Sequence, residues 1–385
     1  MAQNIIPLTH LVVPSDYSAV GMYRMIFPTI YAKTNNRGMK FIESVCYIPD
    51  PNFYKICRTV KFQRLYTPQQ HQFFNTVIKP SSDMYGFWTI MDVDDCLVHD
   101  DIPKYNIAKK YFTKEIAQVM KSIMTSVDFI TTTTDYIANY YSKKFNLDRS
   151  KFIVIPNYLP RWWIGRGHSI AENVHFFNEN LKKKKLKIGF VCSQNHYDIN
   201  NENNGIDDFT HLVDWVKSST DVYDFHFIGA VPKQLEKELA DGKIFIDPSV
   251  DVMNYPNEIA SRHYNVWVSP LQNNVFNCCK SNIKLIEAWS MGIPIFVQDI
   301  ECYHKYTSNL FTTADDLENK ISEIRSNQKT LIDQLKLGMN NVNVGDHNAP
   351  DGWWLERNMS KHYELFSIPQ RTMKIDMRLV DRNKL

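Results

Sequence analysis

The sequence predicts an α/β protein with two doubly wound domains, whose parallel strands end at a shared cleft. Short apolar runs alternate with amphipathic stretches along most of the chain, as strands alternate with helices in such folds. The 385 residues exceed the roughly 250–300 that one hydrophobic core normally serves. A stretch rich in proline, glycine and lysine, residues 156–185, interrupts the pattern and divides the chain.

In the first half, four apolar runs have the length of buried strands. These runs are His10–Val13, Phe87–Met91, Val127–Thr131 and Phe152–Ile155. Between the second and third runs, apolar side chains recur at helical spacing. They are Ile116, Val119, Met120, Ile123 and Met124. We therefore expect a mostly parallel sheet covered by helices.

The second half repeats this alternation and predicts a second α/β domain. Its expected strands are Leu186–Val191, Phe225–Gly229, Ile244–Ile246, Tyr264–Val268 and Ile293–Val297. Its expected helices are Asp208–Lys217, Lys233–Ala240, Asn282–Met291 and Asp315–Ile324.

These patterns divide the chain into a first domain (1–158), a linker (159–185) and a second domain (186–350). The linker ends in the cationic run Lys182–Lys185, which we interpret as a solvated surface. Asp351–Phe366 is a late amphipathic stretch with two adjacent tryptophans. We expect residues 351–385 to return to the first domain and to pack on it as a C-terminal helix.

The composition limits the class of protein. A hydrophobic content of 44% excludes a disordered chain, and a net charge of +2 excludes binding to nucleic acid by overall charge alone. The seven cysteines lack the regular spacing of a disulfide framework or a zinc site, and they suit a reducing compartment. We see no signal peptide and no apolar run of about 20 residues, so we expect a cytoplasmic protein without a membrane partner.

The segment from Asn277 to Pro294 carries the strongest functional signal. Its apolar residues recur at helical spacing, and a predicted strand and a polar loop precede it. The start of this helix offers free backbone N–H groups, the Ser281 hydroxyl and the Lys280 ammonium group, which suit a diphosphate. Glu287 lies two turns further on the same face, where a carboxylate suits the two hydroxyls of a ribose. The alternative is an ordinary amphipathic helix with surface charges.

This segment resembles the donor-binding region of GT-B glycosyltransferases, in particular their retaining, glycosyltransferase-4-like branch. The resemblance is carried by Tyr255-Pro256, Ser269-Pro270-Leu271, Phe276-Asn277, Lys280-Ser281, Lys284, Glu287-Ala288 and Gly292-Ile293-Pro294. It implies two Rossmann-like domains facing a cleft, and a nucleoside-diphosphate sugar, most often a UDP-sugar, as co-substrate. It also implies a set of donor-binding residues, namely Asn277, Lys280, Ser281, Lys284 and Glu287.

Two further segments resemble parts of the same family. Ser18–Arg24 is similar to its first loop, in which Gly21 would let the backbone approach the donor and Arg24 would point a cation into the cleft. Asp224–Val231 is similar to the strand that leads to a base-contacting loop, and Gly229 stands near its end.

The chain departs from the family pattern at two positions. Cys279 stands where the family often has a second glutamate, and the loop Cys192–His196 lacks the arginine and lysine that the family often has there. Lys280 could supply the missing charge. His196 is a candidate for contact with the donor phosphates, and its alternative role is to cap the loop.

Several carboxylates follow the predicted strand Phe87–Met91 directly, namely Asp92, Asp94, Asp95, Asp100 and Asp101. Such crowding of negative charge is costly unless a cation or a substrate faces the carboxylates. They could bind acceptor hydroxyls or act as a general base, as acidic segments do in some GT-B relatives. Two other functions are a D-x-D metal site, which belongs to another glycosyltransferase class, and the nucleophile motif of haloacid-dehalogenase-type phosphatases. A capped turn is the structural alternative. We assign catalysis to Asp94, Asp95 and His99, with Lys280, and acceptor binding to Asp92.

The stretch Lys55–Arg64 spaces its cations two to three residues apart. With Lys104, Lys109 and Lys110 it could line a groove that contacts phosphates, and a solvated face is the alternative. Within the stretch we assign acceptor binding to Lys61 and Arg64. The adjacent Trp162 and Trp163 could stack on a sugar or a base, or be buried at the domain hinge.

These observations lead us to expect a glycosyltransferase that does not strictly require a metal ion. Polysaccharide and protein acceptors are open, and we favour a hydroxymethylated base in phage DNA, which would make double-stranded DNA a partner. A phosphatase that uses Asp92 and Asp94 is the alternative of another class. The protein could be a monomer or a dimer.

Overall fold

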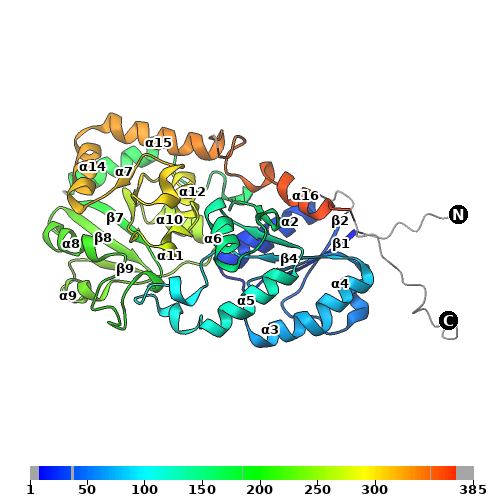
Figure 1. The fold of residues 1–385 in the computed structure, drawn as a ribbon. Helices are drawn as coiled ribbons and strands as arrows, with labels where there is room; N and C mark the ends of the chain where they lie inside the picture. The colour runs from blue at the N-terminus through cyan, green and yellow to red at the C-terminus, as the bar shows by residue number, and fades with distance from the viewer. Residues whose placement is uncertain (1–7, 36–38, 184, 347, 370–385) are drawn as a thin grey trace, which may run out of the picture.

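The computed structural model describes residues 8–35, 39–183, 185–346 and 348–369, in two lobes (Figure 1). Over these residues each lobe contains one six-stranded sheet, and every strand pair in both sheets is parallel. The prediction of two α/β units is therefore confirmed.

The first lobe contains a sheet with the strand order β2-β1-β3-β4-β5-β6. Its strands are β1 (Leu8–Val13), β2 (Met39–Glu43), β3 (Cys57–Gln63), β4 (Trp88–Asp92), β5 (Phe129–Thr132) and β6 (Phe152–Val154). Its helices are α1 (Ala19–Gly21), α2 (Phe27–Thr34), α3 (Pro68–Phe73), α4 (Lys79–Tyr85), α5 (Lys114–Ser126) and α6 (Asp135–Phe145).

Strand β3 corrects our interpretation of Lys55–Arg64 as a cationic surface. The strand lies between β1 and β4, and six of its seven residues are buried. Lys61 is only 2% exposed. Of the four cations in the stretch, Lys61 is buried between Val60 and Phe62, Arg58 and Arg64 are partly buried, and only Lys55 is exposed. The stretch therefore forms no continuous basic groove.

The second lobe contains a sheet with the strand order β12-β11-β10-β7-β8-β9. Its strands are β7 (Leu186–Val191), β8 (Tyr223–Ile228), β9 (Phe245–Asp247), β10 (Val266–Ser269), β11 (Ile295–Gln298) and β12 (Leu310–Phe311). Its helices are α7 (Ile170–Lys182), α8 (Val213–Ser219), α9 (Glu236–Ala240), α10 (Tyr255–Ser261), α11 (Val275–Cys278), α12 (Ile283–Ser290), α13 (Glu301–His304), α14 (Ala314–Ser326) and α15 (Gln328–Asn343).

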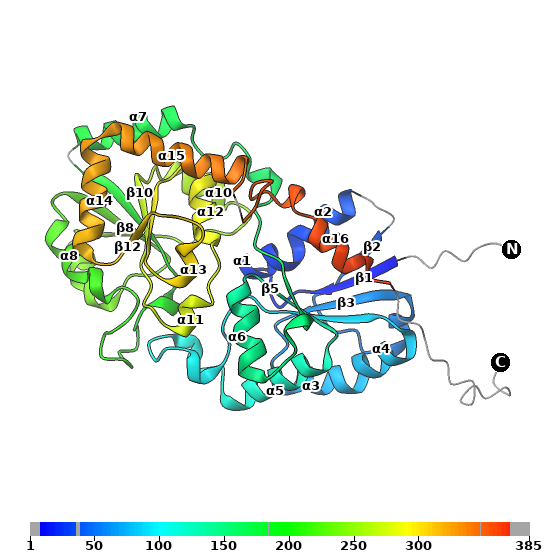
Figure 2. The same cartoon turned by 45° about the horizontal axis from the view of Figure 1, so that its top comes forward.

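Helix α7 occupies much of the stretch that we expected to be a linker. It begins with a capping box between Ser169 and Glu172, which satisfies the first backbone N–H groups of the helix. It runs beside α15 on the outer side of the second lobe (Figure 2). The segment 155–169, which joins the sheets ahead of α7, contains the buried Trp163, stacked on Tyr255 at 5.7 Å.

The C-terminal helix α16 (Ser360–Ser367) returns to the first lobe, as expected, and lies near α2 and β2 in both views (Figures 1 and 2). The Phe366 ring packs 4.9 Å from His10 and 5.0 Å from Phe41, measured between ring centroids. The helix begins later than the pattern indicated, because residues 351–359 form turns that bury Trp353 and Trp354. The expected packing of residues 370–385 lies outside the described residues.

None of the helices in the described ranges is long and apolar enough to span a membrane.

Candidate functional site

A cavity of about 580 Å³ lies between the two lobes, with lining residues from both. Loops at the carboxyl ends of the parallel strands form much of its wall, which is where ligands bind in open α/β folds. From the first lobe it is lined by Ala19, Val20, Tyr23, Arg24, Arg64, Asp94, Asp95 and Asn157. The second lobe contributes Gly229 and residues of the segment that precedes and begins α12.

Helix α12 begins just after Lys280 and Ser281, and both of these residues line the cavity. Its N-cap residue, Asn282, makes no side-chain capping bond, so no side chain from that position occupies the N–H groups of the first turn. Lys284 also lines the cavity, with its Nζ 3.4 Å from the Ser269 hydroxyl. Two ammonium groups and the positive end of a helix therefore converge on one wall of the cavity, as an anion site requires.

Glu287 faces the same cavity one helical turn beyond Lys284. Its Oε1 accepts a hydrogen bond of 2.8 Å from the Tyr23 hydroxyl of the first lobe. Burial raises the pKa of Glu287 to about 7. A carboxylate that already accepts a hydrogen bond from one hydroxyl can instead accept hydrogen bonds from the hydroxyls of a sugar.

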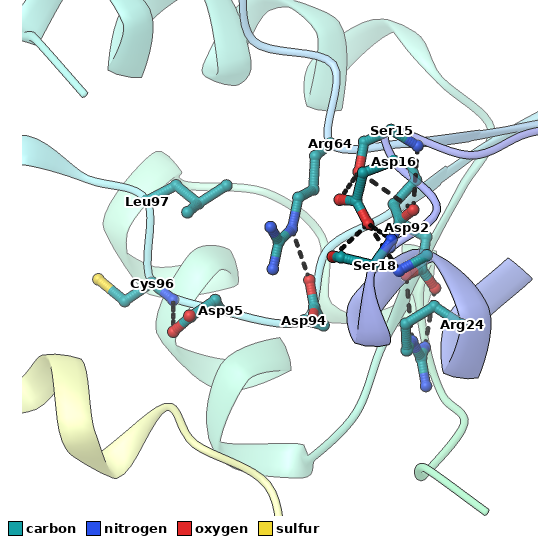
Figure 3. A network of polar contacts seen from close by, with 12 residues as sticks. Ser15, Asp16, Ser18, Arg24, Arg64, Asp92, Asp94, Asp95, Cys96 and Leu97 are labelled. Carbon is teal, nitrogen blue, oxygen red and sulfur yellow. Dashed lines mark hydrogen bonds and ion pairs between the residues drawn. The ribbon is translucent and has the colours of Figure 1, made fainter. Parts of the chain in front are cut away.

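The loop after β4 brings Asp94 and Asp95 to the cavity (Figure 3). Asp95 pairs with Lys280 across the lobes at 2.8 Å. Asp94 accepts a hydrogen bond of 2.8 Å from Arg64 Nε. Burial raises the pKa of Asp94, and Arg64 offsets this effect only in part. The expectation that both carboxylates face a cleft agrees with their positions, and their roles in a reaction remain predictions.

Asp92, the last residue of β4, lies beneath the cavity and does not line it. It is 0% exposed, pairs with Arg24 at 2.8 Å and has the Lys61 ammonium group 3.4 Å away. Burial alone would raise the pKa of Asp92, but Arg24 and Lys61 hold it well below its usual range. Our assignment of Asp92 and Lys61 to acceptor contact does not fit this burial, because their charges neutralise each other inside the lobe.

The same burial argues against the phosphatase hypothesis. A nucleophilic carboxylate must reach the phosphorus atom of its substrate. Asp92 has no exposed surface, and two cations together with the Thr131 hydroxyl, 2.5 Å away, surround it. That hypothesis is not supported.

His196 lines the cavity with its Nδ1 turned toward a buried carboxylate, Asp208, at 2.7 Å. Asp208 also accepts hydrogen bonds of 2.7–2.8 Å from the Tyr105 hydroxyl, the Gln272 backbone N–H and the Asn277 amide. Burial lowers the pKa of His196. With its Nδ1 fixed by Asp208, the ring has Nε2 left for a ligand.

Three predicted site residues have other surroundings than we expected. Asn277 is 0% exposed and supports Asp208 instead of lining the cavity. His99 directs its Nδ1 to the Phe112 carbonyl oxygen and also lies outside the cavity lining. Gly21 packs against its own loop, where an added Cβ would lie 1.8 Å from the Asp16 carbonyl oxygen. For these three residues, packing within the protein takes the place of the expected ligand contact.

Arg24 and Gly229 line the cavity, and each also contacts protein groups on the side away from it. Arg24 is 3% exposed, and Asp92 and the Ile155 carbonyl oxygen occupy its guanidinium group. Gly229 has φ +87°, which favours glycine, and a Cβ there would lie 2.8 Å from the Ser249 hydroxyl.

Sequence reasoning missed the cross-lobe partners of the site. They are Tyr23, which bonds Glu287, Asn157, which donates to the Ser281 hydroxyl at 3.0 Å, and Tyr105 with its acceptor Asp208. Tyr23 lay within the loop Ser18–Arg24 that we had singled out. No local pattern marks the others, because each bond joins residues more than 100 positions apart.

Within the described ranges, no three His, Cys, Asp or Glu side chains converge to hold a metal ion.

Comparison with known proteins finds likeness in structure only. No family model and no curated protein sequence matches the chain. A glycosyltransferase from Rickettsia africae ESF-5 is similar in structure, with a TM-score of 0.58 and 12% identity over 93% of this chain and 97% of that one. HepE from Anabaena, solved in complex with UDP, has a TM-score of 0.62 and 7% identity over 94% and 99% of the two chains.

A third similar structure is WaaG, a glycosyltransferase involved in lipopolysaccharide biosynthesis. Its TM-score is 0.57, with 9% identity over 94% of this chain and the whole of that one. These three likenesses extend over both lobes and nearly the full length of each chain. The chain therefore has the two-domain GT-B fold.

Proposed function

We propose that the protein transfers a sugar from a nucleoside-diphosphate sugar to an acceptor hydroxyl. The observation that carries this proposal is the arrangement along α12. Lys280, Ser281 and Lys284 lie with the open N-terminus of the helix at one end of the cavity, and Glu287 lies one turn further. This spacing matches a diphosphate followed by a ribose.

A uridine nucleotide is the donor that we favour. HepE, which shares the fold, has been crystallised with UDP and with UDP-glucose. The transferred sugar is a hexose or a pentose under this proposal.

Charge neutralisation of the leaving diphosphate would provide most of the catalysis. Lys280, Lys284 and the N-terminus of α12 are placed to stabilise the negative charge that develops as the glycosidic bond to the diphosphate breaks. If the anomeric configuration inverts, Asp94 or Asp95 would accept the proton of the attacking hydroxyl. Burial raises the pKa of Asp94, which makes its carboxylate a stronger base than an exposed one. No step in this scheme requires a metal ion, so we expect turnover in the presence of EDTA.

The structure gives a DNA acceptor no basic groove at Lys55–Arg64, because most of β3 is buried within the first sheet. Hydroxymethylated DNA stays a proposed acceptor. A mass shift on hydroxymethylated but not on plain DNA, after incubation with the protein and UDP-glucose, would support it.

Calorimetric titration with UDP-glucose tests the donor site. We expect binding by the wild-type protein and at least a tenfold loss of affinity in Lys280→Ala and in Glu287→Ala, since each removes a charge from the cavity wall. Lys233→Ala, at an exposed lysine outside the cavity, is the matched control. The proposal fails if UDP-glucose and the other common nucleotide sugars all leave the wild-type protein unbound, or if both variants bind as well as the control.

A further inference from the structure

A second cavity, of about 910 Å³, opens on the other side of Lys280. The first lobe contributes the start of α6, from Thr134 to Tyr140, together with Asp101. The second lobe contributes Val275 and Cys278 of α11 and the segment Glu301–Tyr306. Its volume is in the range of pockets that bind organic ligands, and the donor proposal makes no use of it.

The position of this cavity suits a second substrate. Helix α6 begins directly after β5, and α13 begins directly after β11, so the cavity lies at the carboxyl ends of both sheets. Lys280 lines both cavities, and its ion pair with Asp95 forms part of the boundary between them. A ligand in the second cavity can therefore extend past Lys280 toward Asp95 without passing through the part of the first cavity proposed to hold the nucleotide.

The lining of the second cavity combines polar aromatic rings with carboxylates. Tyr136 and Tyr140 are partly exposed there, and the Tyr140 hydroxyl donates to Asp101 at 2.6 Å. Glu301 is an exposed carboxylate in the same wall. Rings that cover the C–H faces of a sugar, with carboxylates that accept its hydroxyls, are groups that suit a polyhydroxylated ligand.

Two lysines in the cavity add a preference for negative charge. Lys143 and Lys305 are exposed in its lining, and neither has an ion pair in the part of the chain that the structure describes. Lys144, next to the first, is already paired with Asp101 at 2.7 Å. Asp135 also lines the cavity and is paired with Arg149 at 2.9 Å, and Lys305 has only the Tyr306 ring, 5.1 Å away, as a neighbour of this kind. Among the described lining residues, the two lysines without an ion pair therefore outnumber the one such carboxylate, Glu301, and the wall favours an anionic ligand.

We infer that the second cavity binds the acceptor, and that the acceptor is an oligosaccharide carrying negatively charged groups. This inference rests on the proposed function. The acceptor hydroxyl reaches past Lys280 toward the donor. Its oxygen bonds to the anomeric carbon while the bond from that carbon to the diphosphate oxygen breaks, and the bonding electrons leave with the diphosphate. The hydroxyl proton passes to Asp95 or to the departing diphosphate.

The test is a set of titrations with three tetrasaccharides, measured by saturation-transfer NMR and calorimetry. A hyaluronan tetrasaccharide supplies carboxylates, a terminally phosphorylated maltotetraose supplies phosphate, and plain maltotetraose is uncharged. The protein variants are Lys143→Ala combined with Lys305→Ala, and Lys121→Ala as a control at an exposed lysine on α5. UDP-glucose is titrated into every variant in parallel.

We expect at least one anionic tetrasaccharide to bind at least fivefold more tightly than maltotetraose. The double variant should lose at least fivefold in that affinity and keep its UDP-glucose affinity within twofold, whereas the control keeps both. The inference is overturned if neither anionic probe binds, if the uncharged probe binds equally well, or if the double variant binds like the control. Failure of UDP-glucose and of the other common nucleotide sugars to bind the wild-type protein would instead overturn the proposed function. The two failures are distinguishable because the glycan titrations require no donor.

Discussion

At the scale of single residues, Glu287 is the titratable group on which the proposed donor site depends most. Its pKa of about 7 arises from burial, so its charge changes within the physiological range. The ionised carboxylate of Glu287 accepts stronger hydrogen bonds from hydroxyl groups than the neutral acid does. Tyr23 occupies one oxygen in the free protein and would be displaced by a ribose, or share that oxygen with it.

We therefore predict that the affinity for UDP-glucose rises with pH. With a pKa of about 7, Glu287 becomes ionised between pH 6 and pH 8, and the affinity should increase roughly fivefold to tenfold over that interval. His196 has its pKa lowered by burial and should contribute little to this change. Calorimetry across the range checks the rise, and Glu287→Gln should abolish it. A wild-type affinity that falls as the pH rises would contradict the role of Glu287.

Asp208 is a second residue whose importance lies in its neighbours. It orients His196 through a 2.7 Å contact with Nδ1 while it is itself held by donors from both lobes. We predict that Asp208→Asn weakens UDP-glucose binding roughly fivefold, because an amide cannot accept from all of these donors. Asp221→Asn, at an exposed position, is the control. Unchanged affinity, with NMR showing an unchanged His196 tautomer, would remove Asp208 from the site.

At the scale of elements, β4 carries two kinds of carboxylate within a few residues. Asp92 ends the strand and is buried against Arg24, whereas Asp94 and Asp95 follow it and reach the cavity. The ion cluster anchors Arg24, in the helical turns that follow Ser18, to the end of β4. The strand thus fixes the geometry of the cleft through a residue that no ligand contacts.

We predict that Asp92→Asn destabilises the first lobe by about 3–5 kcal/mol, since it leaves Arg24 and Lys61 as uncompensated buried charges. Urea denaturation, followed by a probe in that lobe, measures the loss. Because the folded pKa of Asp92 is depressed, its stabilisation is complete at neutral pH. It is lost as the pH falls below the unfolded value of about 3.9 toward the lower folded value.

The control for this measurement is Asp221→Asn, which removes an exposed carboxylate. It should leave the urea midpoint unchanged. If the two variants unfold alike, the buried cluster does not stabilise the lobe.

At the scale of the whole molecule, the site exists only where the two lobes meet. Tyr23 to Glu287, Asp95 to Lys280 and Tyr105 to Asp208 are hydrogen bonds or ion pairs of 2.7–2.8 Å between the lobes. Phe276 and Cys279 of the second lobe also belong to a hydrophobic cluster of the first. Binding of a donor would therefore exchange contacts that already hold the cleft together.

We predict that Tyr23→Phe combined with Tyr105→Phe loosens the lobes, because it deletes two of these bonds with little change of shape. Small-angle X-ray scattering should show a larger radius of gyration for the free variant than for the wild-type protein. UDP-glucose at saturation should reduce that difference. Tyr111→Phe, at an exposed tyrosine of the first lobe, should scatter like the wild-type protein. Identical scattering from all three proteins would show that these bonds do not control the lobe arrangement.

Sequence patterns were sufficient wherever structure depends on near neighbours in the chain. The alternation of apolar runs predicted two parallel-sheet units, and the spacing of Lys284 and Glu287 placed them one turn apart on α12. Lys280 precedes the helix but lines the same cavity. These features follow from periods of two and 3.6 residues, which the sequence displays directly. The late amphipathic stretch likewise predicted α16, although the turns that bury Trp353 displaced its start.

Tertiary structure alone decided which of these residues line the cavity. The sequence does not distinguish the roles of Asp92, Asp94 and Asp95. In the structure, Asp92 is buried against Arg24 and Lys61, whereas Asp94 and Asp95 line the cavity. Local periodicity does not reveal strand order, so an interior strand such as β3 could be mistaken for a charged surface. The sequence by itself determined two α/β units and the helix α12, at which we propose that a phosphate binds. The partners of that helix come from the other lobe, and long-range packing selects them because their free energy depends on burial that no local segment has on its own.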